Sequence, residues 1–102
     1  MVEQISAIEL KSQLDAGEEF LLIDVREPFE HEEFNIGGRL LPLGSLLESA
    51  SELEDSKDSK IVTYCRSGAR SNMAAEALSN LGFNQVYNLQ GGMINWIETF
   101  GR

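Results

Sequence analysis

The stretch KIVTYCRSGARSNMAAEALSNLG, residues 60–82, changes its periodicity at the lone cysteine of the chain. Residues 60–65 form an apolar, β-branched run that predicts a buried strand. Residues 71–82 are rich in Ala and Leu and finish on a glycine, which favours a helix with a defined end. The six residues from Cys65 to Arg70 form the loop between them. The stretch therefore predicts a strand–loop–helix unit with the cysteine at the carboxyl end of the strand.

The other segments continue this alternation of strands and helices. In chain order they are a helix that begins at a Ser6–Glu9 capping box and ends at Gly17, a strand at 20–25, a short helix within 26–34, a short strand at 39–43, a helix at 45–53, a strand at 85–89 and a helix at 91–101. Such alternation predicts an α/β domain around a central, mainly parallel sheet. A chain of 102 residues suffices for one core, so we expect a single domain over residues 1–102. Ligands of such sheets bind beyond the carboxyl ends of the strands, where Cys65 is expected.

Charge is distributed unevenly along the chain, whose net charge is −9. Residues 1–59 carry 15 acids and 4 bases, whereas residues 60–102 carry 2 acids and 4 bases. Arg66 and Arg70, on either side of the loop, are half of those last bases. The acidic total argues against nucleic acid and anionic membranes as partners. We expect a solubilising acidic surface with one basic spot around the cysteine.

The single cysteine and the amino-terminal residues limit the compartment and the cofactors. One cysteine cannot form an internal disulfide, and no Cys/His cluster indicates a metal site. The start MVEQISAIEL lacks the basic and apolar regions of a signal peptide. No apolar run approaches the roughly 20 residues that span a bilayer. We therefore expect a cytoplasmic protein with no metal.

The loop after Cys65 favours a reactive thiolate. Backbone N–H groups at a helix N-terminus are unpaired, and Gly68 can adopt a positive φ that turns successive amides inward as an anion-binding nest. With Arg66 and Arg70 adding positive potential, such a nest would hold the thiol pKa below its ordinary value of about 8.5. The sulfur would then suit nucleophilic attack on an anionic substrate. The alternative is a buried strand-end cysteine beside two arginines that face solvent.

Two segments, LLIDVREPFEHEEF (21–34) and IVTYCRSGARSNMAAEALSNLGFNQVYNLQGGMINW (61–96), resemble the single-domain rhodanese family of sulfurtransferases. The resemblance extends from about residue 5 to residue 97. It implies a parallel sheet with helices on both faces and no metal or organic cofactor. It also implies that Cys65 accepts a sulfane sulfur and becomes a persulfide. The cradle that would bind the substrate is formed by Arg66, Ser67, Gly68, Ala69, Arg70 and Ser71.

Further expectations concern the side chains around the loop. Asp24 and Arg26 are expected to form an ion pair beneath the loop and to support it. Arg66 is expected to project from the loop and steer the substrate. Arg70 could contact an incoming anion, or it could anchor the loop by holding backbone carbonyls or an acid such as Asp24.

The segment FNIGGRLLP at 34–42 departs from the pattern of the family. The family commonly has Gly-His-Ile-Pro-Gly-Ala followed by Ile-Pro at this point. Here Asn35 stands at the histidine position and Gly37 replaces the proline, in a segment one residue shorter. The departure leaves the cysteine chemistry in place and puts the substrate preference in question.

Loop length separates two cysteine chemistries. Cysteine phosphatases place five residues between the cysteine and the arginine, whereas four residues separate Cys65 from Arg70. The shorter ring of amides suits a single sulfur atom better than a tetrahedral phosphate. The phosphatase pattern also commonly has a histidine before the cysteine, and here that residue is Tyr64.

The pattern therefore favours a sulfurtransferase that takes sulfane sulfur from thiosulfate or another small anionic or persulfide donor. With no second cysteine to resolve a Cys65 persulfide, the acceptor must be external: a thiol, cyanide or a protein. The competing hypothesis is a non-catalytic docking module with the same fold. A thiolate in an anion nest counts against it, because a docking module does not need one.

Overall fold

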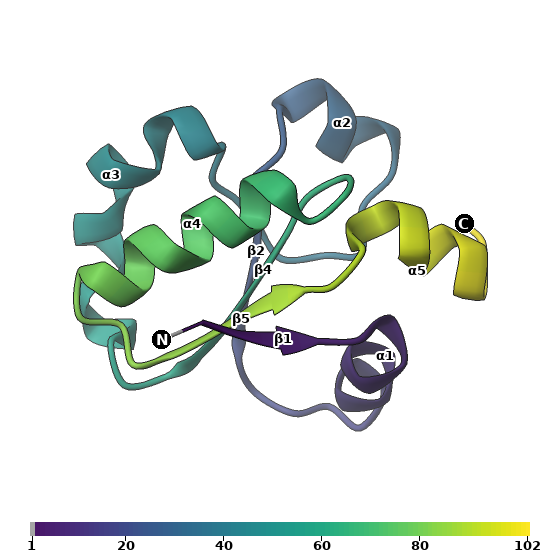
Figure 1. Ribbon diagram of the computed structural model, residues 1–102, viewed down its shortest axis with the longest axis horizontal. Coiled ribbons are helices and arrows are strands. Elements are labelled where there is room, and N and C mark those ends of the chain that lie inside the picture. Colours follow the sequence, from purple (N-terminus) through teal and green to yellow (C-terminus); the bar gives the residue numbers. More distant parts are fainter. Residues whose placement is uncertain (1) are drawn as a thin grey trace.

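A parallel five-stranded sheet forms the centre of the protein, whose computed structural model describes residues 2–102 (Figure 1). Its strands lie in the order β1-β5-β4-β2-β3, and every neighbouring pair is parallel. The strands are β1 (Val2–Ile5), β2 (Leu21–Asp24), β3 (Arg39–Leu40), β4 (Lys60–Tyr64) and β5 (Gln85–Leu89). The expected α/β class with a parallel sheet is confirmed.

Helices cover both faces of the sheet, as expected (Figure 1). The α-helices are α1 (Ala7–Asp15), α2 (Pro28–Glu33), α3 (Leu46–Ser49), α4 (Ala69–Asn80) and α5 (Gly92–Phe100). One buried cluster joins α3 and α4 to the sheet, and a second joins α1 and α5 to the opposite face. None of the helices in the described part of the chain is both long and apolar enough to cross a membrane.

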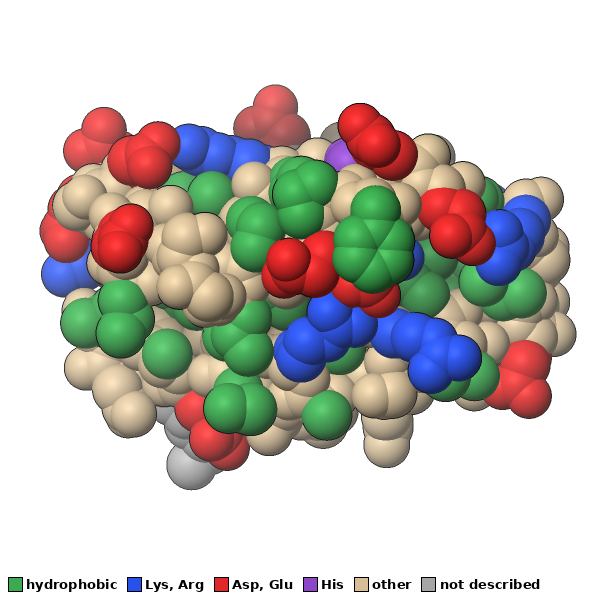
Figure 2. Space-filling view, turned by 90° about the horizontal axis from the view of Figure 1, so that it is seen from above, with side chains coloured by type: hydrophobic (Ala, Val, Ile, Leu, Met, Phe, Trp, Pro, Cys, Tyr) green, Lys and Arg blue, Asp and Glu red, His purple; other side chains and the backbone are tan. Residues whose placement is uncertain are grey.

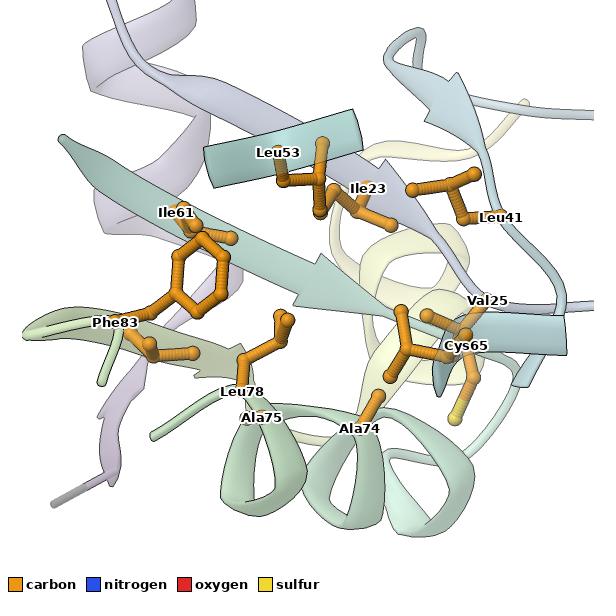
Figure 3. Packing of buried hydrophobic residues seen from close by; sticks show 12 residues of the cluster. Ile23, Val25, Leu41, Leu53, Ile61, Cys65, Ala74, Ala75, Leu78 and Phe83 are labelled. Carbon is orange, nitrogen blue, oxygen red and sulfur yellow. The ribbon is translucent and has the colours of Figure 1, made fainter. Parts of the chain in front are cut away.

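The alternation of side chains along β4 places the cysteine on the α4 face. Ile61 and Cys65 belong to the cluster beneath α4, whereas Val62 and Tyr64 belong to the cluster beneath α1 and α5. Figure 3 shows Ile61 and Cys65 on the same side as Ala74 of α4. Cys65 follows the last residue of β4, so its sulfur lies between the carboxyl edge of the sheet and the start of α4.

Two parts of the chain differ from the sequence-based expectations. The sequence does not predict β1, because Val2–Ile5 is a short edge strand whose two middle residues are exposed. The expected helix at 45–53 is wrong as a continuous element: α3 lies between two 3₁₀ helices, Leu43–Ser45 and Ala50–Ser56. Serines are frequent in this segment, and their side chains compete for backbone hydrogen bonds.

The helix after the cysteine begins two residues earlier than expected. α4 starts at Ala69, with Gly68 as its N-cap at φ 102°. Arg70 therefore belongs to the first turn of the helix, and the expected loop from Cys65 to Arg70 is shorter. Only a glycine adopts this backbone conformation at little cost, which explains why the chain can turn so tightly into the helix.

Candidate active site

The sulfur of Cys65 lies in a cradle of hydrogen-bond donors at the start of α4. The amides of Gly68 and Ser71 donate to Sγ over 3.1 and 3.3 Å, and the hydroxyl of Ser71 lies 3.3 Å from it. The cysteine itself is completely buried. The sequence left two alternatives for this cysteine, a buried strand-end residue and a thiolate in an anion nest. The structure combines them, because the cysteine is buried and hydrogen-bond donors surround its sulfur.

The cradle stabilises the charged form of the thiol. Burial alone would raise the pKa of Cys65, because a thiolate loses solvation in the protein interior. Hydrogen bonds from Ser71, through its hydroxyl and its amide, and from the amides of Gly68 and Ser67 outweigh burial and hold the pKa below the ordinary thiol value. The amides are those that the sequence predicts, and the Ser71 hydroxyl lowers the pKa of Cys65 more than any one of them.

The N-terminus of α5 supports the cradle from the other side. The amide of Met93 donates to the carbonyl of Cys65 over 2.9 Å, and the amide of Ile94 donates to that of Arg66 over 3.0 Å. This approach requires Gly92, because a Cβ there would lie 2.6 and 2.5 Å from those two carbonyl oxygens. Sequence reasoning missed Gly92 as a site residue, although the Gly-Gly pair before a helix was a visible signal.

Arg70 is held by Glu30 of α2. Its Nη1 and Nη2 donate to the two carboxylate oxygens over 2.8 and 3.0 Å, in bidentate geometry. Hydrogen bonding from Arg70 lowers the pKa of Glu30 to about 2. Of the two alternatives for Arg70, this ion pair favours the anchor, but the partner is Glu30, 40 residues away, and the suggestion of Asp24 as that partner is wrong.

Asp24 instead pairs with Arg26 and His31. Arg26 Nη2 lies 2.8 Å from the carboxylate and also donates to the carbonyl of Phe34 over 2.7 Å. His31 Nδ1 lies 2.8 Å from the same carboxylate oxygen. The expected ion pair exists, and its Arg26 both holds the carbonyl of Phe34 after α2 and lies over the ring of Tyr64. Within residues 2–102, no three or more His, Cys, Asp or Glu side chains converge as metal ligands would.

The atypical segment after α2 has its own network of hydrogen bonds. The side chain of Asn35 accepts from the amide of Gly37 over 2.8 Å and donates to the carbonyl of His31 over 2.9 Å. The carbonyl of Gly37 in turn accepts from the hydroxyl of Tyr64 over 2.8 Å. Asn35 and Gly37 thus form a turn that rests on the residue before the cysteine.

A cavity of about 550 Å³ opens between α2 and α5 beside the loop. Phe29, Phe34, Met93 and Ile97 contribute apolar surface to it, and Arg66 lies on its wall. The Arg66 side chain is exposed and forms no ion pair with any acid in the described part of the chain. Figure 2 shows basic, acidic and apolar side chains gathered together on one face of the protein. The sulfur of Cys65 does not itself line the cavity.

The chain is similar to known proteins in both sequence and fold. Residues 6–99 match the family described as rhodanese-like domain. A sulfurtransferase from Allochromatium vinosum is 40% identical over 97 residues, which cover 94% of this chain and 89% of that protein. The probable adenylyltransferase/sulfurtransferase MoeZ of Mycobacterium tuberculosis is 39% identical over 95 residues, 92% of this chain but 24% of its own length. A solved rhodanese-related protein from Thermoplasma volcanium matches with a TM-score of 0.83 and 34% identity, over 98% of this chain and 95% of that one.

Proposed function

Since the chain belongs to the rhodanese-like domain family, we propose that it is a sulfurtransferase in which Cys65 carries the sulfur as a persulfide. Sulfur transfer in general is supported by the family and by relatives that are named sulfurtransferases. The observation that carries the proposal is the sulfur of the only cysteine, which faces the amides of Gly68 and Ser71 and the hydroxyl of Ser71. A docking module would not need these donors around a thiol.

The first half-reaction loads the cysteine. The Cys65 thiolate attacks the outer sulfur of a donor such as thiosulfate and forms a new S–S bond. The S–S bond of the donor breaks, and sulfite leaves with the electron pair. No oxidant or reductant is required, and the amides that stabilise the thiolate would next face the outer sulfur of the persulfide.

The second half-reaction unloads it. An acceptor thiolate, cyanide or a protein thiol attacks the outer sulfur, and the Cys65 thiolate leaves with the electron pair of the broken S–S bond. The chain has no second cysteine to act as this acceptor. The proposed partners are therefore a small anionic donor and an external nucleophile.

Access to the sulfur requires a local movement. Cys65 has no exposed surface, whereas the side chains of Arg66 and Ser67 that follow it are exposed. A donor in the adjacent cavity would lie against Arg66 on its wall. We propose that displacement of the exposed Arg66–Ser67 segment opens the thiol to that cavity.

Intact-mass measurement tests the proposal directly. After incubation with thiosulfate or a low-molecular-weight persulfide, the protein should gain the mass of one sulfur atom and lose it again on addition of a reductant. Transfer to cyanide or a thiol should follow when the loaded protein is separated from the donor. A protein that never gains this mass with either donor is not a sulfurtransferase of the proposed type.

Arg66 is expected to steer the donor. Replacement of Arg66 by alanine should raise KM for thiosulfate several-fold, because an exposed positive charge beside a bound anion is worth roughly 1 kcal/mol. The melting temperature should stay nearly unchanged, since the side chain is exposed and has no acidic partner in the described chain. Steady-state kinetics at low and high salt check this, because salt screens exposed charges. Arg39→Ala is the matched control: that arginine is also exposed but pairs with Glu52. An equal rise for an uncharged persulfide donor, insensitive to salt, would contradict the assignment.

Arg70 is expected to scaffold the site. Arg70→Ala should lower the melting temperature by about 5 °C, the effect of about 1 kcal/mol for a partly exposed ion pair. Turnover should fall roughly tenfold or more, because the first turn of α4 carries the sulfur's donors. Kinetics and thermal unfolding of Arg70→Ala, Glu30→Gln and the double variant check this, and the two losses should not add.

The stabilising effect of this ion pair should also depend on pH. Glu30 has a folded pKa of about 2, lowered from 4.5, so its contribution is present above 4.5 and is lost as the pH falls toward 2. The difference in stability between the native protein and Arg70→Ala should therefore shrink over that interval. A variant that loses turnover but no stability at neutral pH would instead make Arg70 a substrate contact.

A further inference from the structure

A chain of side-chain hydrogen bonds leads from the sulfur of Cys65 to the protein surface. The hydroxyl of Ser71 lies 2.5 Å from Oδ1 of Asn88, and Nδ2 of Asn88 donates to Oε1 of Gln4 over 2.9 Å. Nε2 of Gln4 then donates to Oδ1 of Asn72 over 3.1 Å, and Asn72 reaches Glu76 over 3.4 Å. From Asn88 outward each donor points away from the sulfur, whereas the Ser71 hydroxyl has an acceptor on either side, Cys65 Sγ and Asn88 Oδ1.

The register of the sheet explains why these residues meet. Asn88 of β5 is the partner of Thr63 on one side and of Gln4 on the other. The hydroxyl of Thr63 donates to the carbonyl of Ser71 over 2.9 Å, which ties the strand to the helix above it. A polar row thus crosses three strands directly beneath the first turn of α4. Asn88 and Ser71 are both buried, so neither can exchange its partner for bulk water.

The hydroxyl of Ser71 has more acceptors than protons. It lies within hydrogen-bond distance of Cys65 Sγ, the carbonyl of Gly68 and Oδ1 of Asn88, at 3.3, 3.2 and 2.5 Å. One hydroxyl carries a single proton, so it donates to only one of these at a time. Asn88 offers the shortest contact. Its oxygen is kept toward Ser71 because its NH₂ group is engaged by Gln4.

We propose that Asn88 is a positioning residue that competes with the Cys65 sulfur for the hydroxyl proton of Ser71. While Ser71 donates to Asn88, its oxygen presents lone pairs to the sulfur, which suits a protonated thiol. When the thiol ionises and its proton leaves to water, Ser71 must turn its proton toward the thiolate and give up Asn88. Asn88 therefore acts through Ser71 and need not touch the substrate.

Arg66, next to Cys65, is exposed and has no acidic partner in the described chain, whereas the other charged groups around this network are mostly paired. Arg70 on α4 interacts electrostatically with the thiol and is held by Glu30 of α2. The Asp24–Arg26 pair lies at the carboxyl end of the neighbouring strand β2. At the outer end lies exposed Glu76, and the residues of α5 that donate to the loop, Met93 and Ile94, carry no charge. Each proposed variant leaves these charges in place.

This role of Asn88 rests on the proposed function, because Cys65 is the nucleophile of the proposed sulfur transfer. The test measures the pKa of Cys65 and requires no sulfur donor. Asn88→Leu removes the competing acceptor and keeps an apolar group of similar size. The Ser71 proton is then available to the thiolate, and the Cys65 pKa should fall by about one pH unit, the size of one charge-assisted hydrogen bond. Thiolate absorbance against pH, with Cys65→Ala as the blank, measures the midpoint without requiring access to the buried sulfur.

A double-mutant cycle separates this mechanism from a merely structural role. Ser71→Ala alone should raise the pKa of Cys65, and adding Asn88→Leu to it should produce no further shift. Asn84→Leu is the matched control, since Asn84 bonds to Asp58 outside the network and should leave the midpoint unchanged. If Asn88→Leu does not fold, Gln4→Ala at an exposed position releases the Asn88 amide and should give a smaller fall that also requires Ser71. A midpoint that stays or rises, or that falls equally without Ser71, would overturn the proposal.

Discussion

Replacement of Cys65 by serine is expected to abolish sulfur loading and to reduce sulfur-transfer turnover by at least about 10³-fold. A serine hydroxyl occupies the same place, but it does not ionise near neutral pH and forms no persulfide. The donors from Gly68 and Ser71 would still find an oxygen acceptor, so the fold should survive with a small loss of stability. Intact-mass measurement after incubation with thiosulfate, together with a thermal melt, checks both statements.

Cys65→Ala provides the informative comparison. The change removes only one atom, but the cysteine is buried within the cluster beneath α4. Alanine would leave the donors of the cradle without an acceptor, at a cost of about 1–3 kcal/mol. Alanine should therefore destabilise the protein more than serine, although both should be inactive. A serine variant that still gains the mass of one sulfur would remove Cys65 from the mechanism.

Gly92→Ala is expected to be the most damaging change outside the nucleophile. Its Cβ would lie 2.5 Å from the carbonyl oxygen of Arg66 and 2.6 Å from that of Cys65, and both are backbone atoms that cannot rotate away. Overpacking of this kind costs about 1–3 kcal/mol, and the positive φ of 56° adds about 1 kcal/mol. The melting temperature should fall by about 15 °C. Turnover should fall as well, because the cradle must shift to accommodate the methyl group.

Two other glycines separate the causes of that loss. Gly17 has a similar φ of 71°, and a Cβ added there would meet no atom within 4 Å, so Gly17→Ala should show the conformational cost alone. Gly44 has open space and no positive φ, so Gly44→Ala should be nearly neutral. Thermal melts of the three variants should rank them with Gly92→Ala far below the others. If Gly92→Ala is no worse than Gly17→Ala, α5 does not constrain the cysteine loop.

Local sequence was sufficient to predict most of the fold. Apolar runs predicted β2 and β4, the segment 85–89 predicted β5, and helix-forming residues with glycines at the ends predicted α4 and α5. The capping box at Ser6 is present and starts α1. Each of these elements is favoured by residues adjacent in the chain, so the sequence predicts it. β1 lacks such a signal because it becomes a strand only by pairing with β5.

Asn88 has a visible signal in the sequence. Asn88 occurs in an otherwise strand-forming segment, two residues after Val86, so both side chains point to the same buried face. A buried amide must find hydrogen-bond partners, and this requirement marks Asn88 as unusual. The identity of those partners, Ser71 and Gln4, could not be read from the sequence, since they lie 17 and 84 residues away.

The sequence alone indicates three features of the site: a lone cysteine follows a buried strand, a glycine-containing turn leads from it into a helix, and the chain resembles the rhodanese family. Each of these depends on local backbone preferences and side-chain order. Three others emerged from the folded chain alone: Glu30 holds Arg70, Gly92 lets α5 approach the loop, and the Ser71 hydroxyl lies between the sulfur and Asn88. Such contacts join residues far apart in the chain. They form only when the strands and helices have packed, so no pattern in the local sequence predicts them.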